Sequence, residues 1–232
     1  MKKIKLKARL AGISYLLIIV CGIFSHMVVR ASLIVKNDAA QTAQNIIENE
    51  TLFKLSILSD FIMILSYLML GVLFYTLFKQ TNGLVSKILI SLNVVGASMM
   101  AINMLNQQAA LLILDGSEYL SAFDLSQLEA LSFFFMKLHS YGYQFAAISY
   151  GVWLFPMGYL IIKSNLMPKT IGYFLIIGSI GYTIVFIGTI LGAAVPSDIT
   201  IPADIGEFSL CIFLLIKGVK KIDIDTKEKS AL

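Results

Sequence analysis

The chain has 232 residues, of which 58% are hydrophobic and only 14% are charged, and its mean hydropathy is +0.83. Such an apolar composition excludes a soluble domain of this length and indicates a multi-pass membrane protein. At about 20 to 25 apolar residues per helix plus short connections, the length allows about six spans, which we expect to form a single domain over residues 1–232.

Runs of apolar residues separated by short polar segments predict an all-α, polytopic transmembrane bundle of six spans. Each run has the length that a bilayer requires and carries few or no charges. The expected spans are residues 10–29, 55–78, 88–112, 138–162, 171–194 and 202–219. The first follows a basic N-terminus, as in a secretory signal, but its apolar run is too long and no small-residue cleavage site closes it, so we interpret it as a retained helix.

The sixth predicted span is defined by the chemistry of its ends. Pro202 suits the first position of a helix, where the missing N–H costs nothing. Asp204 and Glu207 fall in the opening turns, where the helix dipole favours acidic side chains. These signals place the start of the helix close to residue 202.

The long polar connection between the first two spans, residues 30–54, is free of proline and glycine. Asp38 is a suitable N-cap for a short helix within it. Ile46, Ile47 and Phe53 are candidates to rest on the membrane surface. We therefore expect a surface helix in this connection.

The connection before the fourth span, residues 115–132, begins with a turn at Asp115-Gly116 and then has a helical pattern from Asp124. Asp124 is a candidate N-cap. We interpret this segment as a surface helix that leads into the fourth span.

Cysteine and motif patterns carry little information on chemistry. Cys21 and Cys211 both fall inside apolar runs, and their spacing suggests neither a disulfide framework nor a zinc site. The sequence has no glycine-rich phosphate loop, HExxH or CxxC motif. Motifs of soluble enzymes are therefore absent; we assign no metal site, and the sequence does not identify a cofactor.

Lysine and arginine are distributed unequally between the two sides of the predicted bundle. Of the 18 basic residues, 14 fall on the side of the N-terminus, the second and fourth connections and the C-terminus. This bias predicts a cell-membrane protein with both termini in the cytoplasm. The net charge of +4 thus reflects topology and gives no support to nucleic-acid binding. The four basic residues on the other side are Arg30, Lys36, Lys54 and Lys137.

Ionisable and amide side chains recur near the outer ends of the spans. Because such groups are costly in a bilayer, each is a candidate functional residue. The amides of the third span, including Gln107, share one helical face. If the helices face each other suitably, these side chains form an outward-opening polar pocket. The predicted pocket residues are His26, Arg30, Asp60, Asn103, Asn106, His139, Tyr143 and Glu207.

Each of these residues also has a purely structural interpretation. Asp60 has the strongest claim to a site or an internal ion pair, with Arg30 or either histidine as its partner. Arg30 could instead extend to lipid headgroups, and His139 could be satisfied by a backbone carbonyl. Tyr143 fits an aromatic belt at the interface, and Glu207 fits a first-turn acid. The two asparagines could simply join helices together.

Several segments resemble one known family, in matching order and spacing over nearly the whole chain. They include "ARLAGISYLL", "HSYGYQFAAISYGVW", "GYLIIKSNLMPKTIGYFLIIGSIGY" and "EFSLCIFLLIKGVK". They are similar to a bacterial integral membrane family of unknown function, domain of unknown function 4386. The resemblance implies a multi-helical inner-membrane protein and transfers no activity, ligand or catalytic residue. Pro156 departs from the family's regular apolar stretch and predicts a kink in the fourth span.

Three classes of function remain open. The first is a sensing, small-molecule-binding or accessory membrane subunit, with a small polar or amphiphilic ligand or a membrane-protein partner in addition to the lipid bilayer. The second is a small-solute transporter, which is weakened by the lack of an internal repeat and of broken helices. The third is a metal-dependent enzyme, which two histidines and two carboxylates would permit in principle. Since no two of these have a ligand spacing within one helix, we expect a protein that is not an enzyme.

Overall fold

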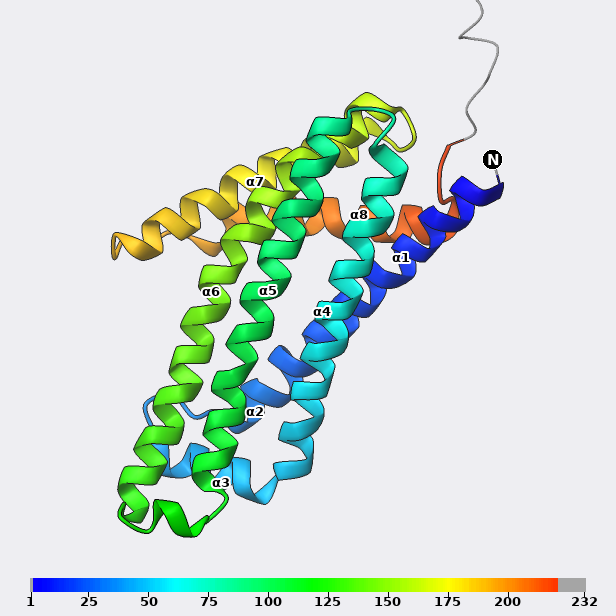
Figure 1. Cartoon of the computed structure of the whole chain (residues 1–232). Coiled ribbons are helices and arrows are strands. Elements are labelled where there is room, and N and C mark those ends of the chain that lie inside the picture. The colour runs from blue at the N-terminus through cyan, green and yellow to red at the C-terminus, as the bar shows by residue number, and fades with distance from the viewer. Residues whose placement is uncertain (1, 221–232) are drawn as a thin grey trace, which may run out of the picture. The chain divides into compact units, whose positions relative to one another are not determined.

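A computed structural model describes residues 2–220, and within this range the chain consists only of helices, turns and connections (Figure 1). The predicted all-α class is therefore confirmed. Predicted cytoplasmic charges from Lys221 onward lie outside the described residues. The elements are α1 (Lys2–Gly22), η1 (Ile23–Arg30), α2 (Ala31–Leu33), α3 (Ala39–Glu48), α4 (Glu50–Phe78), α5 (Gly83–Leu114), η2 (Glu118–Leu120), α6 (Leu125–Ser164), α7 (Lys169–Ile190), η3 (Ser197–Thr200) and α8 (Ile201–Ile216).

Six helical segments in the described part of the chain are long and apolar enough to cross a membrane, as predicted. They are Lys2–Leu33, Glu50–Phe78, Gly83–Leu114, Leu125–Ser164, Lys169–Ile190 and Asp198–Ile216.

Two of these helices end earlier than the sequence predicts. The predicted spans 171–194 and 202–219 run past the ends of α7 and α8. Gly192 and Gly218 adopt positive φ angles of 69° and 73°, a left-handed conformation that commonly ends a helix. Around Gly192 the residues on both sides are apolar, so hydropathy does not reveal the end of α7; at Gly218 the predicted span exceeds the helix by only a few residues.

The chain forms two compact units, each assembled from segments that are distant in sequence. Of the described residues, the first comprises 2–13, 71–91 and 151–220, and the second comprises 14–70 and 92–150. Four long helices contribute residues to both units. The expectation of a single domain over residues 1–232 stays a prediction.

In the first unit, α7 and α8 pack closely and run antiparallel. A Cβ atom on Gly178 would collide with Ala203, and one on Gly206 would meet the side chain of Leu175 at 2.9 Å. Small residues let backbones approach in this way and support helix association in membranes. Pro202 and Asp204 occupy the first turn of α8, as the sequence predicts.

In the second unit, the polar connection after the first span forms the predicted short helix α3. The carboxylate of Asp38 accepts a hydrogen bond from the backbone N–H of Gln41 at 2.9 Å. The expected surface position is wrong for Ile46 and Phe53, which are fully buried in the hydrophobic core. The Asn45 amide donates to the Leu33 carbonyl at 3.0 Å, and this bond helps to fold the helix back onto the protein.

Helix α6 starts at a reciprocal cap and continues for 40 residues. The Gln127 backbone N–H donates to the Asp124 carboxylate at 2.9 Å, and the Gln127 side chain accepts from the Asp124 N–H at 3.0 Å. This is a capping box, so Asp124 is the predicted N-cap. The expected surface helix and the fourth span form one continuous helix, which contains Pro156.

Candidate functional site

The centre of the candidate site is a buried ion pair between the first two spans. Arg30 Nη1 donates to Asp60 Oδ2 at 2.7 Å, and Nη2 donates to Asp60 Oδ1 at 3.2 Å. Nη2 also donates to the hydroxyl oxygen of Ser25 at 3.1 Å. Only 6% of Arg30 and 1% of Asp60 are exposed. This bidentate, charge-assisted pairing fixes both side chains, so Arg30 does not extend to lipid headgroups.

Arg30 is positioned by an irregular segment of the first span. Residues 23–30 form a π-helix, η1, in which each backbone N–H bonds five residues back, and the N–H of Ala31 donates to the His26 carbonyl. This bonding brings residues five apart close together, as it does for Ser25 and Arg30. π-Helical turns are rare and often occur at functional sites. The sequence pattern did not predict this segment.

Gln107 of α5 extends the network from Asp60 to α6. Its Nε2 donates to Asp60 Oδ2 at 2.8 Å and lies 3.1 Å from Nε2 of His139. His139 Nδ1 lies 3.3 Å from the Asn103 carbonyl oxygen. A neutral His139 with its proton on Nδ1 satisfies these contacts, because Nδ1 then donates to the carbonyl and Nε2 accepts from Gln107. The two N–H bonds of Gln107 thus join the carboxylate to the imidazole.

Two asparagines continue the network along α5. Asn103 Nδ2 donates to the His139 carbonyl at 2.9 Å, and Asn106 Nδ2 donates to Asn103 Oδ1 at 3.0 Å. The Asn103 side chain lies directly over Gly142, where a Cβ atom would collide with its amide. Gly142 therefore provides the space for this contact between α5 and α6.

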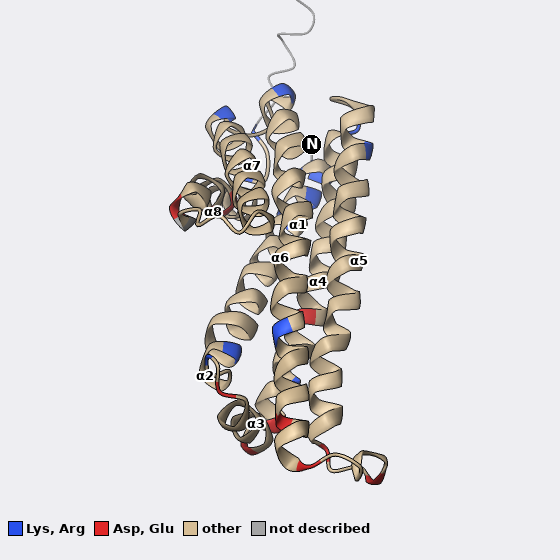
Figure 2. Ribbon diagram, turned by 90° about the vertical axis from the view of Figure 1, so that its left-hand side faces the viewer, with Lys and Arg blue, Asp and Glu red and all other residues tan. Residues whose placement is uncertain are grey.

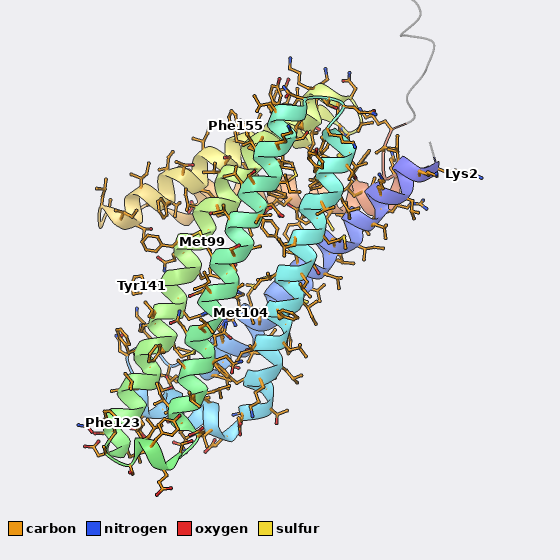
Figure 3. The ribbon with its side chains drawn as sticks, in the orientation of Figure 1. Lys2, Met99, Met104, Phe123, Tyr141 and Phe155 are labelled. Carbon is orange, nitrogen blue, oxygen red and sulfur yellow. The ribbon has the colours of Figure 1, made fainter. Side chains whose placement is uncertain are left out.

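His26 and Tyr143 form the more accessible edge of the network. His26 Nε2 is 3.8 Å from Asp60 Oδ1, which is too long for a hydrogen bond. Its ring centroid lies 4.3 Å from that of Tyr143, and a quarter of the His26 side chain is exposed. Tyr141, by contrast, points away from the neighbouring helices of its unit (Figure 3) and is largely exposed, as expected of an interfacial aromatic residue.

Two buried atoms near Asp60 have no hydrogen-bond partner among the described residues. They are Gln107 Oε1 and His26 Nε2. An unpaired buried polar group costs about 1 to 3 kcal/mol, and each such group in a native protein requires an explanation. Gln107 Oε1 can only accept a hydrogen bond, so the group that satisfies it must carry an N–H or O–H.

The second unit brings together seven of the eight residues predicted for the pocket. Glu207 lies on α8, which belongs to the first unit, so its membership stays a prediction. Gln107 shares the predicted helical face of Asn103 but is not among the predicted pocket residues. Ser25 is not predicted either, because its spacing of five residues to Arg30 is meaningful only in a π-helix. That these residues bind a ligand stays a prediction.

Metal binding receives no support from the side chains. Among residues 2–220, no three His, Cys, Asp or Glu side chains are grouped so that they could hold a metal ion. The carboxylate of Asp60 is already engaged by the Arg30 guanidinium.

Comparison with known proteins identifies one family. A family model described as a domain of unknown function (DUF4386) matches residues 10–218. No curated protein and no solved structure matches the chain. The matched range reaches from the first span to the end of the sixth, and it includes every residue of the polar network.

Proposed function

The chain belongs to the DUF4386 family, whose model is described as a domain of unknown function, so its role has to be inferred from the polar network. We propose that it is a cell-membrane protein that binds a small polar ligand beside Asp60. In this proposal the protein senses the ligand or acts as an accessory subunit of another membrane protein. The observation that carries this proposal is the unpaired oxygen Gln107 Oε1, which is fully buried next to the ion pair.

The chemistry around Gln107 favours a particular class of ligand. The free oxygen accepts hydrogen bonds and cannot donate, and the neighbouring Asp60 carboxylate, which is paired with Arg30, also offers only acceptors. The terminal nitrogens of Arg30 already donate to Asp60 and Ser25. An anionic ligand would therefore meet acceptors and few free donors. We propose a neutral or cationic ligand with N–H or O–H groups, which enters at the edge formed by His26 and Tyr143.

Small donor solutes are expected to stabilise the purified protein. Acetamide and methylguanidinium should raise its melting temperature by a few degrees, whereas acetate should not, since a ligand at a hundred times its Kd contributes about 2.7 kcal/mol. Thermal unfolding in detergent measures this effect. Stabilisation by none of the solutes would contradict ligand binding, and stabilisation by acetate alone would contradict the proposed ligand chemistry.

The matched control uses two adjacent glutamines of α5. Gln107→Met changes the side-chain volume little but removes the free acceptor together with the hydrogen bonds to Asp60 and His139, and it should abolish the stabilisation by acetamide. Gln108 is exposed, so Gln108→Met should keep it. Equal responses of the two variants would place solute binding elsewhere on the protein.

Transport is the second candidate function. The sequence shows no broken helix, but the irregular segment η1 supports transport. Irregular helices that line a polar site in the membrane are typical of secondary transporters, and η1 carries both His26 and Arg30. Uptake of a stabilising solute into proteoliposomes would establish transport, and binding without uptake would favour sensing. We do not propose an enzymatic activity or a cofactor.

Labelling from the two sides of the membrane tests the proposed orientation. In a background with Cys21→Ala and Cys211→Ala, Gln44→Cys in α3 and Gln80→Cys between α4 and α5 should react with an impermeant maleimide from opposite sides. The basic bias of 14 in 18 Lys and Arg residues supports a cytoplasmic location for position 80. Reaction of both cysteines from one side would refute the six-span topology.

A further inference from the structure

The first unit contains a groove beside α7 and α8 that the polar network does not involve. Its volume is about 340 Å³, and its surface is mostly apolar. Both helices are candidate membrane spans. Lipid acyl chains can therefore reach a groove on their surface. The lining residues are Ile171, Ser209, Ile212, Phe213, Ile216 and Lys217.

One end of this groove is basic. Lys217 lines it and is exposed, and α8 ends there because Gly218 turns the chain with a positive φ of 73°. The backbone N–H of Lys220 donates to the Leu166 carbonyl at 2.8 Å, which ties this end to the connection between α6 and α7. Gly218 also lies against Lys5 of α1. Lys217 thus lies at the groove, and Lys5 and Lys220 lie close to the same end of α8 along the chain or through Gly218.

Acidic residues of this unit lie at the opposite end of α8. Among its described residues the acids are Asp198, Asp204 and Glu207, which precede the groove or lie in the opening turns of the helix. Figure 2 shows basic residues where α6 passes into α7 and acidic residues on α8. The charge along α8 therefore changes from negative to positive toward Lys217.

We propose that this groove binds one anionic phospholipid. Its acyl chain lies along Ile212 and Ile216, and its phosphate is held by Lys217 and Lys220. From Ser209 to Lys217 the helix rises about 12 Å, which matches several methylene groups of an acyl chain. Lysines beside a membrane surface attract anionic headgroups, and the apolar lining selects a lipid over free phosphate.

Competition between lipids in nanodiscs tests the site. Native mass spectrometry of the wild-type protein should show preferential retention of phosphatidylglycerol over phosphatidylcholine. Lys217→Gln should weaken this preference about fivefold, the contribution expected from one lysine near an anionic surface. Lys87 is an exposed lysine of the same unit outside the groove lining, and Lys87→Gln should leave the preference unchanged. Equal losses in the two variants would show general charge attraction and overturn the proposal.

A second variant tests the binding of the acyl chain separately from the binding of the headgroup. Ser209→Trp fills the groove while every lysine remains, and it should abolish the retained phosphatidylglycerol. Ile216→Trp serves the same purpose if the first variant does not fold, since Ile216 is 66% exposed. Unchanged retention in the folded variant, or displacement of the lipid by glycerol phosphate, would show that the groove does not hold an acyl chain.

Discussion

Replacing Asp60 with asparagine is expected to lower the free energy of unfolding by about 3 to 5 kcal/mol, because the substitution leaves the buried Arg30 guanidinium without its counter-charge. The side chains are nearly equal in size, so lost packing contributes little. Arg30 would keep hydrogen bonds to Ser25 and the new amide, but neither neutralises a charge. Thermal or denaturant unfolding in detergent measures the loss.

Two comparisons isolate the ion pair as the cause. Arg30→Met combined with Asp60→Asn removes both charges and should recover most of the lost stability, since a buried pair can often be replaced by uncharged residues at little cost. Glu50→Gln breaks the exposed Glu50–Lys54 pair of the same helix and should cost no more than about 0.5 kcal/mol. A double variant as unstable as Asp60→Asn would show that Asp60 acts through other contacts.

The same double variant also separates stability from function. If the network binds a ligand, acetamide should not raise the melting temperature of the double variant even though its stability is recovered. The reason is that both charged side chains beside the ligand have been replaced. A double variant that regains both stability and ligand response would assign the ion pair a structural role alone.

Much of the fold could be predicted because each signal is local. A bilayer demands a fixed length of apolar chain, so six spans can be read from hydropathy alone. Helix starts depend on one or two side chains, and Asp38 and Asp124 were recognised as caps for this reason. Helix ends at Gly192 and Gly218 depend on a backbone conformation that hydropathy does not reveal.

Most residues of the polar network, but not Ser25 or the role of Gln107, could be predicted from the sequence, whereas their contacts could not. Asp60 and His139 stand out because a polar side chain within an apolar run is costly in a membrane. Which groups meet depends on helix neighbours and rotations, and these are properties of the tertiary structure. Gln107 therefore joins Asp60 to His139 although the sequence singled out Asn106 in its place. The change to π-helical bonding in η1 likewise has no sequence pattern that distinguishes it from an ordinary α-helical turn.

Gly142 shows how a residue with no side chain can determine such contacts. Gly142→Ala is expected to destabilise the protein by about 1 to 3 kcal/mol, as overpacking does in a tight interior. The new methyl group would occupy the place of the Asn103 amide and break its hydrogen bond to the His139 carbonyl. Unfolding experiments on the variant measure the loss, and ligand-dependent stabilisation reports whether the network survives.

A control variant and a double variant test whether the collision at Gly142 causes the expected loss of stability. Gly83 begins α5 with no atom within 4 Å of an added Cβ, so Gly83→Ala should be neutral or slightly stabilising. Asn103→Ala combined with Gly142→Ala removes the collision, and the combined loss should be smaller than the sum of the two single losses. Strictly additive losses would mean that the two residues do not interact, and the contact between α5 and α6 at Gly142 would then not hold the network together.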